Sequence, residues 1–441
     1  MKMQYLLLCA ALGLGAQAAE LAAGPMAGPP SMRGVTLWLQ ADGAARAAIE
    51  YWPEDSQASK RRSAPVTLDA SEQFAGKISL FGLEPGRRYG YRVVLNDKPA
   101  GKQTYRFATQ ELWQWRKDAP DFTVLAGSCN YGNEPGYDRP GKPYGDHHLT
   151  VFKTMAAQNP DLTLWLGDNL YYREVDFSPE GMAYRWQRDR SQGYLQPLLQ
   201  LGAHAAIWDD HDYGPNDANS SFVLKGESLK LQKRYWANPS YGLPETPGVF
   251  TTFSFNDVDF FMLDDRYWRD DNRFPDAADK AMFGREQMRW LKNALLASTA
   301  PFKVIAGGTQ LMNKSGQSDS WHDFPVERDD FIEFLNKTKL EGVLFLSGDV
   351  HRSELTKVER SGAYPLYDLT CSPMTSGIYV DKRQSERANL VPGTSVMGER
   401  NFCQLRFEGS KAERRLLLRV YNDKGELKWE KPLSRKELTY Q

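Results

Sequence analysis

The sequence predicts two domains, a small all-β sandwich followed by a larger α/β domain whose mixed sheets are flanked by helices. With 441 residues, the chain is too long for one ordinary hydrophobic core. Short segments rich in β-forming residues occupy positions 33–109, whereas apolar strands alternate with amphipathic helical patterns from Phe122 onward. We therefore expect an N-terminal β-sandwich at residues 33–109 and a second domain at residues 120–441.

The segment before the first domain is typical of a secretory signal peptide. Lys2 supplies positive charge, residues 5–14 form an apolar run too short to span a bilayer, and Ala-Gln-Ala at residues 16–18 offers small residues for cleavage. No twin-arginine pair precedes the apolar run, so we expect export through the general pathway, removal of residues 1–19, and a secreted or periplasmic protein. We find no later stretch long and apolar enough for a transmembrane helix. The Gly- and Pro-rich residues 24–30 are expected to form a flexible lead-in.

Three cysteines follow the predicted cleavage site: Cys129, Cys371 and Cys403. In an oxidising compartment, this odd count indicates one disulfide and one thiol kept for another purpose. Cys371 and Cys403 both lie in strand-like segments and are the pair we consider, although spacing alone leaves their pairing open. Cys129 would then be the unpaired thiol.

The first domain contains short β-forming segments at residues 36–39, 48–52 and 89–93. Turn-like stretches such as residues 83–86 (Leu-Glu-Pro-Gly) separate them. This spacing fits a sandwich of the immunoglobulin or fibronectin kind. Residues 111–120 are expected to connect it to the second domain.

The second domain shows six strand candidates, separated by helical patterns of which residues 285–297 and 329–340 are the clearest. The strand candidates are Phe122–Ala126, Leu162–Leu166, Ala205–Trp208, Asp259–Leu263, Phe302–Ala306 and Val343–Leu346. Residues 403–407 and 415–421 return to a strand-like pattern. We therefore expect a mixed or two-sheet sandwich rather than a purely parallel sheet.

A polar cluster follows each of these six strands. The clusters are Gly-Ser-Cys-Asn (127–130), Gly-Asp-Asn-Leu-Tyr (167–171), Asp-Asp-His-Asp (209–212), Asp-Asp-Arg (264–266), Gly-Gly-Thr-Gln (307–310) and Ser-Gly-Asp-Val-His (347–351). Asp and Gly favour turns, so one such cluster would mean little. If the strands are mostly parallel, all six clusters gather at one edge of one sheet, where ligands bind.

So many carboxylates at one edge would repel each other unless a cation neutralised them. Mixed Asp, His, Tyr and Cys donors suit divalent or trivalent metals. A pair of metals can hold a hydroxide and neutralise a phosphoryl group during in-line attack. Arg266 would add a bidentate clamp for phosphate oxygens, unless it forms an ion pair with Asp264 or Asp265 instead.

The order of these motifs behind a β-sandwich resembles the alkaline phosphatase D (PhoD) family. The motifs are Gly-Ser-Cys, Gly-Asp-Asn-Leu-Tyr, Trp-Asp-Asp-His-Asp, Leu-Asp-Asp-Arg and Ser-Gly-Asp-Val-His. PhoD-type enzymes are phosphodiesterases and phosphomonoesterases within the calcineurin-like metallophosphoesterases. The resemblance covers nearly the whole mature chain and implies a metallophosphoesterase-type α/β sandwich at residues 120–441.

The resemblance also implies roles for individual residues. It implies ferric iron and calcium as the metals, although other divalent metals are compatible with the donors. Iron would be bound by the Cys129 thiolate, the Tyr171 phenolate and His351, with Asp168 bridging to a calcium-like position served by Asp210 and Asp349. His211 would protonate the leaving oxygen. Apart from the resemblance, we expect Arg266 and Asn216 to hold the phosphate, although Asn216 could be a ligand or just a turn residue.

Two positions depart from the family pattern. This chain has Asp212 where the PhoD pattern usually has Glu, and Asp265 where it has Thr. The metal set is unaffected, but the substrate preference is left open. Asp209, Asp210 and Asp212 cannot all be ligands, and we expect one of them to orient a neighbour.

The sequence thus predicts an exported metal-dependent hydrolase of small-molecule phosphate esters. Long loops at residues 130–147, 172–194 and 374–399 would form the substrate wall. The net charge of −1 gives no indication of a nucleic-acid-binding surface. A phospholipase D-like or nucleotide-directed hydrolase on the same scaffold remains an alternative, as does a catalytically inactive surface binding protein. The oligomeric state is left open.

Overall fold

The computed structural model describes residues 19–146, 148–313, 319–380 and 389–440. The expected signal peptide therefore lies outside the described residues, apart from Ala19. Among the described helices, none has the length and apolar character needed to cross a membrane.

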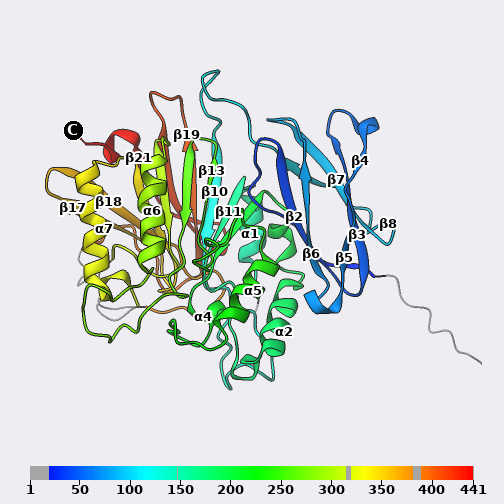
Figure 1. The fold of residues 1–441 in the computed structure, drawn as a ribbon, viewed down its shortest axis with the longest axis horizontal. Coiled ribbons are helices and arrows are strands. Elements are labelled where there is room, and N and C mark those ends of the chain that lie inside the picture. Colours follow the sequence, from blue (N-terminus) through cyan, green and yellow to red (C-terminus); the bar gives the residue numbers. More distant parts are fainter. Residues whose placement is uncertain (1–18, 147, 314–318, 381–388, 441) are drawn as a thin grey trace, which may run out of the picture.

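Two large mixed sheets form the centre of the molecule (Figure 1). The first has the order β21 (Leu427–Ser434), β20 (Arg415–Asn422), β19 (Asn401–Glu408), β10 (Phe122–Gly127), β11 (Leu162–Leu166), β12 (Ala203–Ile207), β1 (Leu21–Ala27), β2 (Gly34–Ala41), β6 (Ala75–Phe81). The second has the order β13 (Thr251–Phe255), β14 (Val258–Met262), β15 (Phe302–Ala306), β16 (Val343–Ser347), β18 (Ala363–Thr370), β17 (Glu354–Arg360). Strands β10, β11 and β12 are mutually parallel, as are β14, β15, β16 and β18.

Helices cover the outer faces of both sheets. The described helices are α1 (Val151–Ala157), α2 (Pro179–Arg190), α3 (Gln196–Leu199), α4 (Asp210–Tyr213), α5 (Lys225–Tyr235), α6 (Arg285–Ala297) and α7 (Pro325–Thr338). Side chains alternate along β10, so Val124 and Ala126 face the core shared with the second sheet while Leu125 packs toward α1 and α2. In Figure 1, α6 and α7 lie on the left, beside β17 and β18, and α1, α2 and α5 lie between the central strands and β2 and β6. The layers are therefore helix, sheet, sheet, helix.

The two-sheet alternative predicted from the sequence is confirmed, and the gathering of all six strand ends on one sheet is wrong. Strands β10 to β12 belong to the first sheet, and β14 to β16 belong to the second. The bounds of β11, β15 and α6 are as predicted, and those of the other four strands differ by one or two residues. Helix α7 begins four residues before the predicted start, because Pro325 supplies a first-turn residue with a fixed backbone angle.

The N-terminal strands enclose a hydrophobic core of their own, including Leu37, Ile49 and Tyr91. A third sheet faces β2 and β6. It contains β4 (Arg61–Arg62), β3 (Ala45–Pro53), β7 (Arg88–Leu95) and β8 (Lys98–Pro99), with β5 (Val66–Leu68) on β3 and β9 (Tyr105–Ala108) on β7.

The expected flexible lead-in at residues 24–30 is wrong for its first part, because Gly24–Ala27 lies in β1. The backbone N–H of Gly24 donates to Gln196 Oε1 (2.8 Å), and Gln200 Nε2 donates to the Gly24 carbonyl (2.8 Å), so side chains around α3 satisfy this strand. Strand β1 pairs with β2 and, at Ala27–Ala203, with β12. One sheet therefore runs from the N-terminal unit into the second unit.

Cys371 and Cys403 form a disulfide, whereas Cys129 is a buried free thiol. Cys371 directly follows β18 in the second sheet, and Cys403 lies in β19 of the first. The disulfide therefore joins the two sheets. This resolves the pairing that spacing left open.

Candidate metal centre

The carboxyl ends of the parallel strands of both sheets meet at one place, near α4 in Figure 1. The backbone N–H of Gly348, after β16, donates to the carbonyl of Gly308, after β15 (2.8 Å). A Cβ atom on Gly348 would lie 2.6 Å from Ser128 Oγ, and one on Gly167 would lie 2.5 Å from the Cβ of Asp209. Only glycine fits such close approaches. The tight contacts bring loops of the two sheets together despite their separate strand pairing.

Four of the predicted ligands have left-handed backbones. The φ angles are 61° at Cys129, 50° at Asp168, 70° at Asp349 and 52° at His351. Non-glycine residues rarely adopt this conformation, and each instance costs on the order of 1–3 kcal/mol, which is why such residues gather at functional sites. Their concentration here is independent support for a site at these loops.

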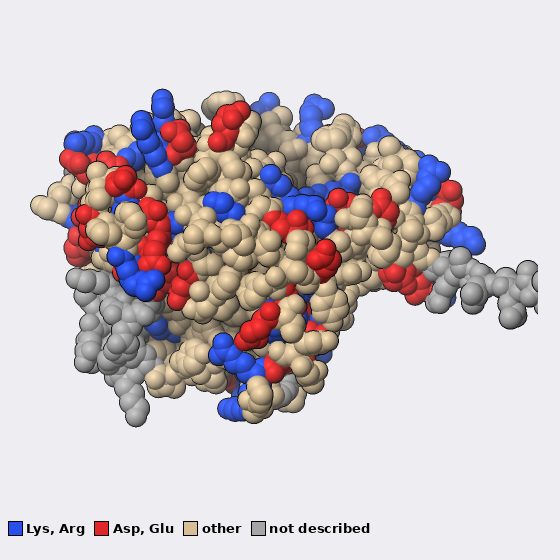
Figure 2. Space-filling view, turned by 60° about the horizontal axis from the view of Figure 1, so that its bottom comes forward, with Lys and Arg blue, Asp and Glu red and all other residues tan. Residues whose placement is uncertain are grey.

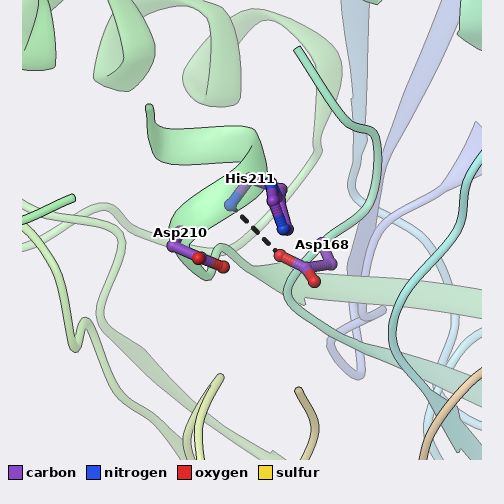
Figure 3. A group of neighbouring side chains, drawn as sticks. All are labelled: Asp168, Asp210 and His211. Atoms are coloured by element: carbon purple, nitrogen blue, oxygen red, sulfur yellow. Dashed lines mark hydrogen bonds between the residues drawn. The ribbon is translucent and has the colours of Figure 1, made fainter. Parts of the chain in front are cut away.

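Asp168, Asp210 and His211 form a group whose potential ligand atoms all lie within 4.8 Å of one another. Figure 3 shows the arrangement: Asp168 follows β11, and Asp210 and His211 open the short helix α4. The backbone N–H of His211 donates to Asp168 Oδ1 (3.2 Å), which joins the two loops. Asp168 and Asp210 are 1% and 4% exposed. The three side chains can hold a cation in a nearly dry environment.

Cys129 and Tyr171 also lie beside Asp168. Cys129 Sγ is 3.5 Å from Asp168 Oδ2, and the Tyr171 hydroxyl group donates to the same oxygen (2.8 Å). Asp168 therefore presents one oxygen to His211 and the other to a sulfur and a phenol.

Asp349 and His351 approach from the second sheet. Cys129 Sγ is 3.3 Å from the Asp349 carbonyl oxygen. Nδ1 of His351 lies at hydrogen-bond distance from the Gly377 carbonyl. A carbonyl can only accept, so Nδ1 carries the proton and Nε2 keeps its lone pair for a metal.

Burial and mutual repulsion shift the pKa values of these acids. Burial, followed by the charges of Cys129 and Asp210, raises the pKa of Asp168. Burial, followed by Asp210 and Asp319, raises the pKa of Asp349 to about 7. Burial also raises the pKa of Cys129 to about 11. A bound cation would favour the ionised forms of all three.

Asp210 differs from its neighbours. Burial raises its pKa, but His211, Arg266 and the backbone N–H of Asp217 outweigh that effect and lower it to about 2. Its Oδ1 atom is buried without a hydrogen-bond partner among the described residues. A buried anionic oxygen with no donor is costly unless a cation balances it. The residues present therefore fit a metal.

The three neighbouring acids separate into different roles. Asp212 accepts hydrogen bonds from the backbone N–H groups of Asp168 (3.2 Å), Asn169 (3.2 Å) and Asp209 (2.8 Å). Asp209 accepts from Arg266 Nε (2.7 Å). Asp210 alone of the three belongs to the group with Asp168 and His211. Asp212 instead fixes the loop that carries Asp168.

The Arg266 side chain is 1% exposed and is engaged by carboxylates. Its Nε donates to Asp209 Oδ1 (2.7 Å), and its Nη2 forms an ion pair with Asp319 Oδ2 (2.8 Å). Asp264 instead accepts the backbone N–H of Arg266 (3.0 Å), and Asp265 lies 4.0 Å from its Nε. The main partner that the sequence missed is Asp319, which follows no predicted strand and belongs to no motif.

Asn216 is exposed, and its side-chain amide donates to Asp217 Oδ2 (2.7 Å). The backbone N–H of Asp217 in turn donates to Asp210 Oδ2 (2.7 Å). Asn216 thus contacts Asp217, which in turn contacts Asp210 of the group in Figure 3. The predicted substrate role of this amide stays a prediction.

Aromatic side chains from two of the predicted wall loops meet beside the site. Tyr144 packs against Tyr131 and Tyr171, and its hydroxyl group lies 3.5 Å from His351 Nε2. Tyr379 donates from its hydroxyl group to that of Tyr144 (3.2 Å). Part of the second loop, residues 381–388, lies outside the described residues. Tyr131, Tyr144 and Tyr379 were not predicted, since no spacing rule marks a loop tyrosine.

Acidic and basic side chains are interspersed over the face shown in Figure 2. On this face the described residues form no broad area of one sign. This distribution agrees with the near-neutral charge of the chain.

The family model of PhoD-like phosphatases matches residues 139–410, a range that contains every candidate site residue except Cys129. Alkaline phosphatase D of Bacillus subtilis (strain 168) is 28% identical over 324 residues, which make up 62% of this chain and 52% of that protein. The chain thus matches about half the length of this curated relative.

Two solved structures share the fold over nearly the whole chain. A structure of PhoD superposes with a TM-score of 0.76 at 19% identity, covering 96% of this chain and 91% of the other. Purple acid phosphatase PPD1 from yellow lupin (Lupinus luteus) seeds gives a TM-score of 0.67 at 13% identity, covering 93% and 74%. At these identities the likeness shows a common fold with mixed sheets and helices.

Proposed function

This chain belongs to the PhoD-like phosphatase family, and we propose that it hydrolyses small-molecule phosphate esters at a metal centre built around Asp168. The observation that carries the proposal is the buried group of Asp168, Asp210 and His211, which Cys129 and Tyr171 adjoin. When bound, the metals would lower the pKa of a water molecule and neutralise charge on the phosphoryl group.

We assign the candidate ligands to two metal positions. Cys129, Tyr171 and His351 would hold ferric iron, and Asp210 and Asp349 would hold calcium, with Asp168 between them. The contacts of Asp168 with both sides of the site support this assignment. Sulfur and phenolate donors suit iron, whereas carboxylates suit calcium.

The purified protein should contain iron, and it should be coloured because a ferric phenolate absorbs visible light. Replacing Tyr171 with Phe should remove the colour, whereas Tyr172→Phe, the neighbouring buried ring, should keep it. Elemental analysis for iron, calcium and zinc and a visible spectrum measure this. A colourless, iron-free and fully active enzyme would refute the role of Tyr171 but not ester hydrolysis.

We assign His211 the proton that the leaving oxygen requires. Its ring packs against Tyr171 at 4.1 Å between centroids. Burial lowers the pKa of His211, and the carboxylate of Asp210 opposes this shift. The negative charge of Asp210 therefore favours the protonated form of His211, which is the form that can donate a proton to the leaving oxygen.

Replacing His211 with Asn should slow hydrolysis most for esters whose alcohols leave poorly. General acid catalysis contributes roughly 10²–10⁴-fold, so kcat for an alkyl ester should fall by that range. For a nitrophenyl ester the decrease should be much smaller, because that group leaves without a proton. Equal losses on both esters would contradict the acid role.

Arg266 and Asn216 are the groups we assign to the phosphate itself. Asn216 has an exposed amide near Asp210, which supports contact with substrate. The guanidinium of Arg266 is already held by Asp209 and Asp319, and its assignment is tested in the Discussion. Tyr131, Tyr144 and Tyr379, which lie on two of the wall loops, would help to determine whether the enzyme accepts monoesters or diesters.

We further propose that the protein is exported and that its N-terminal unit is an immunoglobulin-like sandwich. The Cys371–Cys403 disulfide supports an oxidising compartment. Two strand-paired faces around one core support the sandwich. Activity on a bis-aryl phosphate but not on a phospholipid or nucleotide would separate the proposed function from its nearest alternatives, and the absence of any hydrolysis by the metal-loaded protein would favour a binding protein.

A further inference from the structure

Ser372 lies at a point where three parts of the candidate metal centre meet. It is fully buried and follows Cys371, the disulfide-bonded residue after β18. Its hydroxyl oxygen is 3.0 Å from Cys129 Sγ and 3.1 Å from the backbone nitrogen of His351. Cys129 follows a strand of the first sheet and His351 a strand of the second. One hydroxyl group therefore touches two candidate ligands of the same metal position.

The direction of both hydrogen bonds follows from the proton count. The backbone N–H of His351 can only donate, so Ser372 Oγ accepts there. A hydroxyl group has a single hydrogen, which is left for Cys129 Sγ. Ser372 is thus an O–H donor to the sulfur.

Ser128 also contacts the sulfur but is placed differently. Its Oγ lies 3.3 Å from Cys129 Sγ, 3.1 Å from the carbonyl of Cys371 and 3.2 Å from the backbone nitrogen of Asp349. The carbonyl can only accept, so it takes the hydrogen of Ser128. Of the two serines beside Cys129, only Ser372 has its hydrogen free for the sulfur.

Hydrogen bonds to its backbone fix the position of Ser372. Its backbone N–H donates to Ser353 Oγ (3.2 Å), and its carbonyl accepts from Asn401 Nδ2 (2.9 Å). The adjoining disulfide ties the same segment to β19. The hydroxyl group is therefore held in one place with respect to both sheets.

We propose that Ser372 is a positioning residue of the metal centre that sets both the electron donation of the Cys129 sulfur and the placement of His351. The proposal rests on the proposed function, because it requires Cys129 to bind a metal as a thiolate. A hydrogen bond to a thiolate withdraws electron density from the sulfur and tunes the metal it binds. The bond to the His351 backbone links the second ligand to the same group.

The test is cobalt(II) binding by the full exported chain, stripped of metal and reloaded, because a cobalt thiolate has a near-ultraviolet charge-transfer band. Ser372→Ala should move this band to longer wavelength, since the sulfur then holds its electrons less tightly. Cobalt affinity, measured by competition with a chelator, should fall roughly 10–100-fold, as is usual when a partner of a ligand is removed. Ser128→Ala is the matched control and should leave the band in place.

The outcomes separate the two proposals. If the wild-type protein shows a band that Cys129→Ser removes, but Ser372→Ala leaves its position and the affinity unchanged, then the positioning role is refuted and the metal centre stands. If the wild-type protein shows no sulfur band, then Cys129 is no ligand, and both proposals fail at this residue. Near-ultraviolet circular dichroism of each variant establishes that it is folded.

Discussion

Replacing Asp168 with Asn should abolish metal binding at the bridging position and lower hydrolysis of a bis-aryl phosphate by roughly 10³-fold, since a catalytic metal supplies several kcal/mol of charge stabilisation. Asparagine keeps the shape of the side chain but loses its charge. Asp168 Oδ1 accepts from the His211 backbone, and Oδ2 lies beside Cys129 and Tyr171. Elemental analysis and steady-state kinetics measure the two effects.

Asp161→Asn provides the matched control. Asp161 precedes β11 and Asp168 follows it, so the two acids lie at opposite ends of the same strand. Asp161 Oδ2 accepts a backbone hydrogen bond from Thr123 (2.8 Å), so this side chain also has a local partner to lose. The control should keep its metal and its activity. Full activity and metal content in Asp168→Asn would show that the site has been misplaced.

Much of the fold could be predicted because short apolar strands and one amphipathic helix leave a clear periodic pattern. Leu162–Leu166 is buried on both faces, and Arg285–Ala297 places Met288, Leu291 and Leu295 on one side. The assignment of strands to sheets was not predictable, because pairing depends on contacts distant in sequence. Strand β1 was missed for a related reason: Gly24 and Pro25 indicate a loop, and Gln196 and Gln200 satisfy its backbone from elsewhere.

The grouping of the candidate site residues was predictable where a motif follows a strand. Asp168, Asp210 and His211 come together as the strand-end argument requires, because parallel strands deliver their carboxyl ends to one edge. The left-handed backbone conformations of Cys129 and Asp349 could not be predicted from their residue types. The ion pair between Asp319 and Arg266 could not be predicted either, because Asp319 lies in a segment without a strand or a motif. Such contacts arise only from the folded arrangement.

Replacing Arg266 with Met should destabilise the protein by about 3–5 kcal/mol, the usual effect of removing one partner of a buried ion pair. The guanidinium is 1% exposed and bonds to Asp209 and Asp319, which are themselves buried. Methionine has a similar length but no charge, so Asp209 would lose its buried counter-charge, whereas Asp319 would keep its ion pair with Arg269. Urea denaturation of the full protein measures the change in the free energy of unfolding.

Arg273→Met is the control for this experiment. Arg273 pairs with Asp271, two residues before it, but its side chain is 91% exposed. A solvated ion pair contributes little to stability. The control should therefore show no measurable change in unfolding.

The same variant decides between two roles for Arg266. A clamp that served only the phosphate would raise KM and leave the free energy of unfolding unchanged. If the guanidinium neutralises Asp209, its removal destabilises the fold. Arg266→Met combined with Asp209→Asn should then restore part of the loss, because Arg266 is the cation paired with Asp209 among the described residues, whereas Asp319 also has Arg269. We expect this partial restoration, since Arg266 Nε donates to Asp209 Oδ1 (2.7 Å) in the folded protein. The two measurements are read together: a loss of stability reports the neutralisation of Asp209, and a rise in KM reports the proposed contact of Arg266 with the ester.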